Sequence, residues 1–237
     1  MDSSSARALE LLNAKIVRCR VCPRLVAYRE RVAREKRFAY RAWNYWAKPV
    51  PGFGDPKAEL LILGLAPAAH GGNRTGRVFT GDRSGDFLYQ ALYRAGFANQ
   101  STSTHRGDGL ELKNAYIAAA VRCAPPDNKP LPCELSSCRP YFERELELIR
   151  PRVILCLGNV AMHVYLGVIK RARKISSLSL FPFCHGASYE LGEGLPKLFA
   201  SYHPSQQNTF TGRLTEAMLA TVLNEIRKFL LCASSKT

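Results

Sequence analysis

The sequence predicts a three-layer α/β/α sandwich with a central four-stranded parallel sheet. Four apolar runs are each bounded by turn residues and separated by helix-length segments, which is typical of buried parallel strands joined by crossover helices. The 237 residues are enough for one sizeable core, and they contain no internal repeat and no low-complexity linker. We therefore expect one domain over residues 1–237. The expected strands lie in residues 59–67, 114–122, 151–158 and 197–204.

Helical segments flank these strands. The first two segments are close to the N-terminus, and the second of them is strongly basic. Prolines and glycines then interrupt the chain over residues 48–58. Ser84 is a suitable N-cap for the next helix, which Gly96 ends. The expected helices cover residues 6–19, 24–40, 85–96, 138–149 and 214–231.

The chain is strongly basic. Lys and Arg total 34 against 19 Asp and Glu, a formal net charge of +15. This excess is larger than solubility requires, and a polyanion such as DNA is the partner that it favours. The sequence contains no apolar span long enough for a transmembrane helix, and its first ten residues do not resemble a signal peptide. We expect a cytoplasmic, monomeric protein that binds DNA and no membrane.

Cysteines at two places in the chain indicate a metal site. Cys19 and Cys22 form a C-x2-C pair, and Cys123 and Cys138 can supply two more thiolates from a distant segment. Four cysteine ligands suit either tetrahedral zinc or a four-iron, four-sulfur (4Fe–4S) cluster. A disulfide needs an oxidising compartment, and a thioredoxin-like motif needs a preceding strand; the sequence indicates neither. It also leaves Cys133 as an alternative to Cys138.

Polar loops follow three of the expected strands. In an open parallel sheet ligands bind beyond the carboxyl ends of the strands, so these loops can converge on one cleft. They cover residues 64–82, 122–130 and 201–208 and are rich in Gly, Pro, His, Asn and Asp. The first is not a nucleotide-binding P-loop, because Arg77 and Val78 stand where that motif needs Lys and Ser or Thr.

Three of these segments resemble a known family. "GLAPAAHGGNRTGRVFTGDRSG", "VRCAPPDNKP" and "SYHPSQQNTFTGRLT", together with the spaced cysteines, are similar to the family 5 (type B) uracil-DNA glycosylases from about Cys19 to the final helix. The resemblance implies a 4Fe–4S cluster rather than zinc, with Cys138 rather than Cys133 as a ligand. It also implies a monofunctional glycosylase that removes deaminated bases from DNA and so initiates base excision repair.

The chemistry of this reaction points to two catalytic residues. Hydrolysis of an N-glycosidic bond requires stabilisation of a cationic sugar and of a base that leaves as an anion. Asp82 matches the family position that orients water or stabilises the sugar; the alternative is a helix cap, a role that Ser84 can fill better. His203 matches the histidine that donates to the pyrimidine oxygen, although a single His after a strand is more often structural.

The resemblance also implies residues that hold the substrate. A flipped base needs a flat surface, and Phe79 occupies the family's stacking position. Backbone N–H groups of Leu65 and Ala66 would meet the base carbonyl. Asn128, which the resemblance adds as a third catalytic residue, matches an asparagine near the abasic sugar; the alternative is a turn residue beside prolines. Further contacts are expected from Pro204 and Ser205, as a loop pressing into the minor groove, and from Arg74, Arg77 and Arg213, as phosphate contacts.

The second strand departs from better-known members of the superfamily. Several of them carry an asparagine that pairs with the uracil edge, whereas this strand has Ala118, Ala119 and Ala120. Fewer paired hydrogen bonds predict a pocket that accepts hypoxanthine and modified uracils as well as uracil. The alternative function is a non-catalytic iron-sulfur or zinc sensor of DNA damage or redox state, which would need neither Asp82 nor His203.

Overall fold

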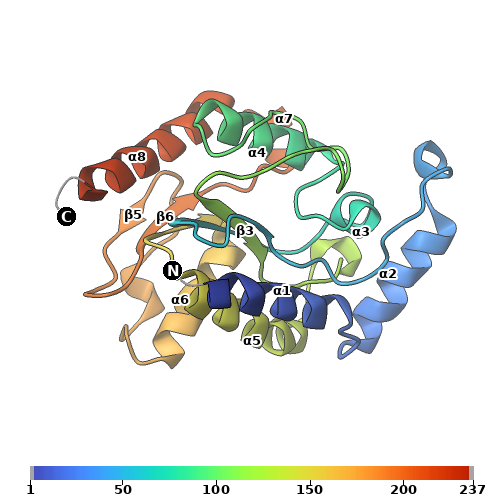
Figure 1. The fold of residues 1–237 in the computed structure, drawn as a ribbon, viewed down its shortest axis with the longest axis horizontal. Coiled ribbons are helices and arrows are strands. Elements are labelled where there is room, and N and C mark those ends of the chain that lie inside the picture. The colour runs from blue at the N-terminus through green and yellow to red at the C-terminus, as the bar shows by residue number, and fades with distance from the viewer. Residues whose placement is uncertain (1–2, 235–237) are drawn as a thin grey trace.

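The computed structural model describes residues 3–234, which form a six-stranded sheet in the order β1-β3-β2-β4-β6-β5 (Figure 1). The four expected strands are its parallel centre. The expectation of four strands is corrected to six, because a two-residue antiparallel strand flanks each edge and is too short to leave a periodic pattern. The strands are β1 Phe53–Gly54, β2 Leu60–Gly64, β3 Ala115–Ala119, β4 Val153–Leu157, β5 Ser188–Tyr189 and β6 Lys197–Ser201.

Helices cover both faces of the sheet (Figure 1). Alternate residues of β2 enter two different cores: Leu60 and Ile62 pack in the one that includes α4 and α8, and Leu61 and Leu63 in the one that includes α1, α5 and α6. This alternation is the period of two expected of a strand that is buried on both faces. The helices are α1 Ser3–Val17, α4 Arg83–Arg94, α5 Pro132–Ile149, α6 Asn159–Arg171 and α8 Glu216–Ser234.

The second basic helix is shorter than expected. α2 covers Pro23–Glu35, because the backbone of Lys36 leaves the helical conformation with φ 46° and ψ 152°, while its N–H still bonds to the carbonyl of Val32. A 3₁₀ turn, η1, follows at Phe38–Tyr40. Residues 36–48 therefore form a separate segment rather than the end of a helix.

The helix that carries Cys138 begins earlier than expected. α5 starts at Pro132, a residue type favoured in the first turn of a helix, so Cys138 lies in its second turn. The shorter elements are α3 Gly72–Thr75, η2 Pro126–Asn128, η3 Leu178–Leu180 and α7 Gln206–Phe210. Over residues 3–234, none of the helices combines the length and apolar character needed to cross a membrane.

Candidate active site

Asp82 lies where the loop after β2 becomes α4. Its backbone is extended, and its Oδ1 accepts a hydrogen bond of 3.0 Å from the N–H of Gly85. Asp82 rather than Ser84 is therefore the N-cap, because Ser84 is already the second residue of the helix. Burial raises the pKa of the Asp82 carboxyl above its ordinary value, while hydrogen bonds from the N–H groups of Gly85 and Ser84 act in the opposite direction.

The second oxygen of this carboxylate, Oδ2, lies against Gly71. A Cβ at Gly71 would lie 1.8 Å from Oδ2 of Asp82, so no residue with a side chain fits there unless the carboxylate moves. The loop therefore places the backbone of Gly71 next to Oδ2 of Asp82.

Phe79 covers the end of β2. A Cβ at Gly64 would lie 2.8 Å from Cε2 of Phe79, so the ring rests on the last residue of the strand. Phe79 has φ 49°, a left-handed conformation that is uncommon for a bulky residue and that concentrates at functional sites. Its ring centroid is 5.7 Å from that of His203, with an interplanar angle of 33°.

His203 follows β6, and its ring lies against that of Phe79. A Cβ at Gly158, which follows β4, would lie 3.4 Å from Cβ of His203, and the His203 carbonyl accepts a hydrogen bond of 2.8 Å from Asn208. Burial lowers the pKa of the imidazole to about 4. His203 is therefore neutral at physiological pH, and one ring nitrogen carries a proton that it can donate.

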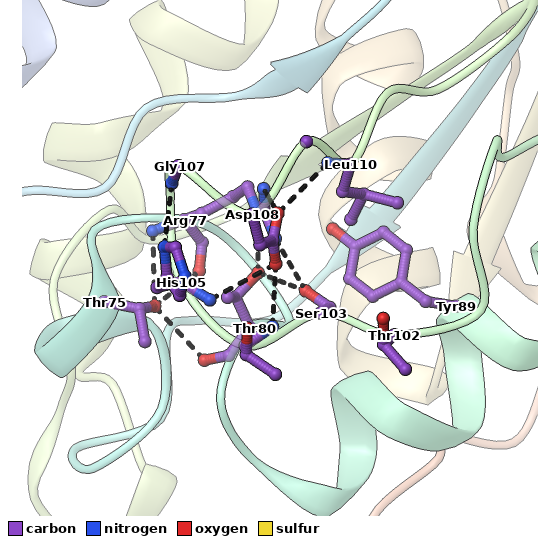
Figure 2. Close-up of polar contacts among 12 residues, drawn as sticks. Thr75, Arg77, Thr80, Tyr89, Thr102, Ser103, His105, Gly107, Asp108 and Leu110 are labelled. Carbon is purple, nitrogen blue, oxygen red and sulfur yellow. Dashed lines mark hydrogen bonds and ion pairs between the residues drawn. The ribbon is translucent and has the colours of Figure 1, made fainter.

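A buried polar network holds the segment around Phe79, and sequence reasoning did not find it. Figure 2 shows the guanidinium of Arg77 paired through both terminal nitrogens with Asp108, at 2.8 and 2.6 Å. Its Nε also donates to Thr80 at 2.9 Å, and Thr80 contacts the Ser103 hydroxyl at 2.7 Å. Asp108 accepts further hydrogen bonds from backbone N–H groups in residues 104–110, and these contacts hold the pKa of its carboxyl well below the ordinary value although burial raises it. The network fixes the residues on both sides of Phe79.

Two of the arginines expected to contact phosphates are buried instead. Arg77 belongs to the network above and is 4% exposed. Arg74, also 4% exposed, donates to the carbonyls of His70 at 2.7 Å and Gly81 at 2.6 Å. Both side chains serve the loop that carries Asp82: Arg74 bonds to two of its carbonyls, and Arg77 ties it to Ser103 and Asp108. Arg213 is exposed above the ring of Tyr202 and stays a candidate for a phosphate contact.

The remaining expected residues differ in how they are placed. The N–H groups of Leu65 and Ala66 follow β2 and have no protein acceptor among the described residues. Asn128 lies on the exposed turn after β3, where it and Asp127 both have left-handed backbones. Pro204 is buried, and the Ser205 hydroxyl accepts from the N–H of Asn208 as the N-cap of α7. The fully exposed residues of α7 are Gln206, Gln207 and Phe210.

The four expected cysteine ligands line one small cavity. Cys19 and Cys22 come from the turn between α1 and α2, Cys123 from the loop after β3, and Cys138 from α5. The competing Cys133 is exposed. Over residues 3–234, however, no three His, Cys, Asp or Glu side chains stand close enough together to hold a single metal ion.

Arginines surround this cavity. Arg29 is 2% exposed and its Nη1 lies 2.8 Å from Sγ of Cys123. Arg122 is also buried and is ion-paired with Glu145. Nε of Arg29 and both Nε and Nη1 of Arg122 have no hydrogen-bond partner in the described part of the chain. Burial raises the pKa of the Cys123 thiol to about 12 and also raises the pKa of Cys138.

The fold is an α/β fold in which Asp82, in the loop between β2 and α4, and His203, directly after β6, follow parallel strands, and α/β enzymes bind their ligands beyond the carboxyl ends of such strands. Residues 51–227 match the model of the uracil DNA glycosylase superfamily. The chain is 52% identical to the type-5 uracil-DNA glycosylase of Thermus thermophilus (89% of this chain, 93% of that protein). It is 48% identical to that of Mycobacterium leprae (96% and 98%) and 51% identical to that of Mycobacterium tuberculosis (92% and 80%). The chain belongs to the uracil DNA glycosylase superfamily and, within it, to the type-5 uracil-DNA glycosylases.

Proposed function

We propose that this protein hydrolyses the N-glycosidic bond of uracil and other deaminated bases in DNA and so initiates base excision repair. The observation that carries the proposal is that the chain is about half identical to type-5 uracil-DNA glycosylases over most of its length. The buried Asp82 carboxylate and a neutral His203, whose ring lies against that of Phe79, would supply the two groups that the reaction requires. The basic surface, with a net charge of +15, suits a DNA ligand.

Asp82 acts on the sugar side of the bond. The bond between C1′ and the base nitrogen breaks, and the base leaves with the electron pair. The carboxylate stabilises the positive charge that develops on the sugar, orients the water that adds at C1′ and accepts its proton. Because Oδ1 is engaged by Gly85, Oδ2 is the oxygen available for this role.

His203 and the end of β2 act on the base side. A neutral imidazole donates a hydrogen bond to the pyrimidine oxygen as negative charge develops there. The N–H groups of Leu65 and Ala66 serve a base carbonyl in the same way, because neither has a protein acceptor in the described chain. Phe79 stacks on the flipped base, and Asn128 approaches the abasic sugar once DNA is bound.

The range of bases follows from β3. Ala118, Ala119 and Ala120 are buried and have no side-chain polar group to pair with a uracil edge. We therefore propose that hypoxanthine and modified uracils are also excised, more slowly than uracil, because the pocket does not penalise the wrong hydrogen-bond pattern.

The cysteine cavity suits a 4Fe–4S cluster. A zinc tetrahedron with Zn–S bonds of about 2.3 Å would bring the sulfurs to about 3.8 Å from one another. The thiols here are not grouped that tightly. In a cluster each thiolate binds a different iron, so the four sulfurs can lie farther apart than around one zinc ion. The unpaired N–H groups of Arg29 and Arg122 are suited to hydrogen-bond an anionic cluster and its thiolates. Cys19, Cys22, Cys123 and Cys138 would hold it, and it would join the α1–α2 turn to the β3 loop and α5.

A single-turnover assay tests the activity. Matched duplexes carrying uracil, hydroxymethyluracil or hypoxanthine are incubated with excess protein and then treated with alkali to break abasic sites. Asp82→Ala and His203→Ala should each lower the rate by a factor on the order of 10² or more. A wild-type protein that binds uracil-containing DNA without releasing the base would favour the damage sensor instead.

A comparison of two cysteine variants tests the cluster. Cys138→Ser should abolish broad absorbance near about 400 nm, which arises from iron–thiolate charge transfer. Cys133→Ser, on an exposed position of the same helix, is the matched control and should keep the absorbance. The opposite result would reassign the fourth ligand, and a colourless protein with stoichiometric zinc would reject the cluster.

A further inference from the structure

Residues 36–48, which we call the arm, combine aromatic and basic side chains without an acidic one. The segment contains five aromatic residues and four Lys or Arg residues, and no Asp or Glu occurs from Lys36 to Gly54. Figure 1 shows that the light-blue segment after α2 projects away from the sheet and the helices that cover it. Alternating cations and aromatic rings are the side chains that proteins use to contact nucleic acids without reading their sequence.

The tip of the arm is exposed but organised. Phe38 is 82% exposed, the largest exposed fraction among the exposed large hydrophobic residues described, and the guanidinium of Arg41 lies 4.9 Å above its ring. Nζ of Lys36 donates to the carbonyls of Trp43 at 2.8 Å and Arg41 at 3.3 Å, which closes the arm into a loop. A structured loop loses less conformational entropy when it binds than a flexible one.

The base of the arm is attached to the Asp82 loop. The rings of Tyr40 and Trp43 lie 4.0 and 4.1 Å from the guanidinium carbon of Arg74. Nη2 of Arg74 donates a hydrogen bond of 2.6 Å to the carbonyl of Gly81, the residue before Asp82. Trp46 adds a backbone hydrogen bond of 2.9 Å to the carbonyl of Arg74. The arm is therefore on the side of the molecule that receives DNA.

We propose that the arm is a second DNA contact, which binds the duplex beside the flipped nucleotide. Arg41 contacts a phosphate, and Phe38 packs against sugars and base edges in the adjacent minor groove. Tyr40 contacts Arg74, which bonds to the residue next to Asp82, and Phe38 is two residues before Tyr40. This short path keeps Phe38 within about 25 Å of Asp82, which corresponds to about seven base pairs along a duplex. The inference rests on DNA as the ligand in the proposed function but not on base excision.

Equilibrium binding to a duplex that carries a tetrahydrofuran residue, which has no base to release, tests the arm. Between about 50 and 200 mM salt, Arg41→Ala should reduce the slope of log affinity against log salt by about 0.9, and at about 0.1 M it should weaken binding roughly eightfold. Phe38→Ala should weaken binding about tenfold without changing the slope, as for loss of a buried apolar contact. Both side chains are exposed, so the fold should be unaffected.

Matched controls come from a different part of the surface. Leu180 is 60% exposed and Arg171 ends α6 in an exposed position, and alanine at either should leave affinity and salt slope unchanged. Shortening one flank of the duplex below about seven base pairs should abolish the difference between wild type and Phe38→Ala. Shortening the other flank should leave this difference in affinity unchanged.

Unchanged affinity and salt slope in both arm variants would overturn the inference and would point to a protein partner for the exposed ring. The inference would also be overturned if the arm variants weakened binding no more than the control variants did. The same holds if their loss of affinity did not depend on the length of either duplex flank. A protein that binds through the arm but releases no uracil would reject the proposed activity and leave the arm as a DNA contact.

Discussion

Gly71→Ala tests whether the position of the Asp82 carboxylate determines the rate. The added Cβ would lie 1.8 Å from Oδ2 of Asp82, and contacts below 3.0 Å are essentially never seen. The carboxylate must therefore move by about 1.2 Å, or the loop must shift with it. A displacement of about 1 Å at a reacting group can cost about 100-fold in rate, so we expect a loss of that size.

Single-turnover excision of uracil at saturating protein measures this effect, because it removes contributions from binding and product release. Gly167→Ala is the matched control, since a Cβ at that position of α6 meets no atom within 4 Å. It should leave the rate unchanged. Circular dichroism and thermal unfolding of both variants confirm that the comparison concerns folded protein.

A double-mutant cycle makes the prediction specific to Asp82. Once Asp82→Ala has removed the carboxylate, Gly71→Ala has nothing left to displace, so the double variant should be no slower than Asp82→Ala alone. Additive losses would show that Gly71 acts through another group. A Gly71→Ala rate within about threefold of wild type would refute the claim that carboxylate position limits the reaction.

Three further outcomes follow from burial and pairing. Asp82→Asn should raise the thermal midpoint while lowering the excision rate, because it keeps a capping oxygen and removes a charge whose ionisation burial opposes. Burial holds the pKa of His203 at about 4, below its usual value near 6.5, so the unfolded chain takes up this proton first. The free energy of unfolding should therefore fall as pH falls from about 6.5 to about 4, and His203→Gln should show less of this fall in urea titrations. Arg77→Met should destabilise the protein by about 3–5 kcal/mol in the same titrations, because it leaves the buried Asp108 carboxylate without its cation. A loss below about 1 kcal/mol would contradict this, and adding Asp108→Leu should recover part of the loss.

The parallel strands were predictable because burial on both faces leaves continuous apolar runs bounded by turns. β4 shows this directly, since all five of its residues are buried. The two edge strands were not predictable. At Phe53–Gly54 the pairing depends on the backbone of β3 rather than on a local pattern, and the glycines around it indicate only a break.

The sequence indicates candidate residues for the site but not the buried contacts that hold the surrounding loops in place. His203 stands out because a polar motif follows an apolar strand. The pairing of Arg77 with Asp108 does not, because it joins residues 31 positions apart in two loops on either side of α4. A basic residue in a basic chain predicts a phosphate contact, and only the structure distinguishes buried Arg74 and Arg77 from exposed Arg213.

Capping α4 and the proposed action on a sugar are compatible roles for Asp82. A buried carboxylate needs stabilisation to stay ionised, and the N-terminus of α4 provides it through the N–H of Gly85 and the partial positive charge of the helix. The same hydrogen bond fixes the rotation of the side chain, which places Oδ2 over Gly71. Burial still raises the pKa of this carboxyl, and Arg74 opposes that rise and bonds to the carbonyl of Gly81, so it acts on both the charge and the position of Asp82. A cap of this kind lets the helix hold one carboxylate oxygen and leaves the other for the reaction that we propose.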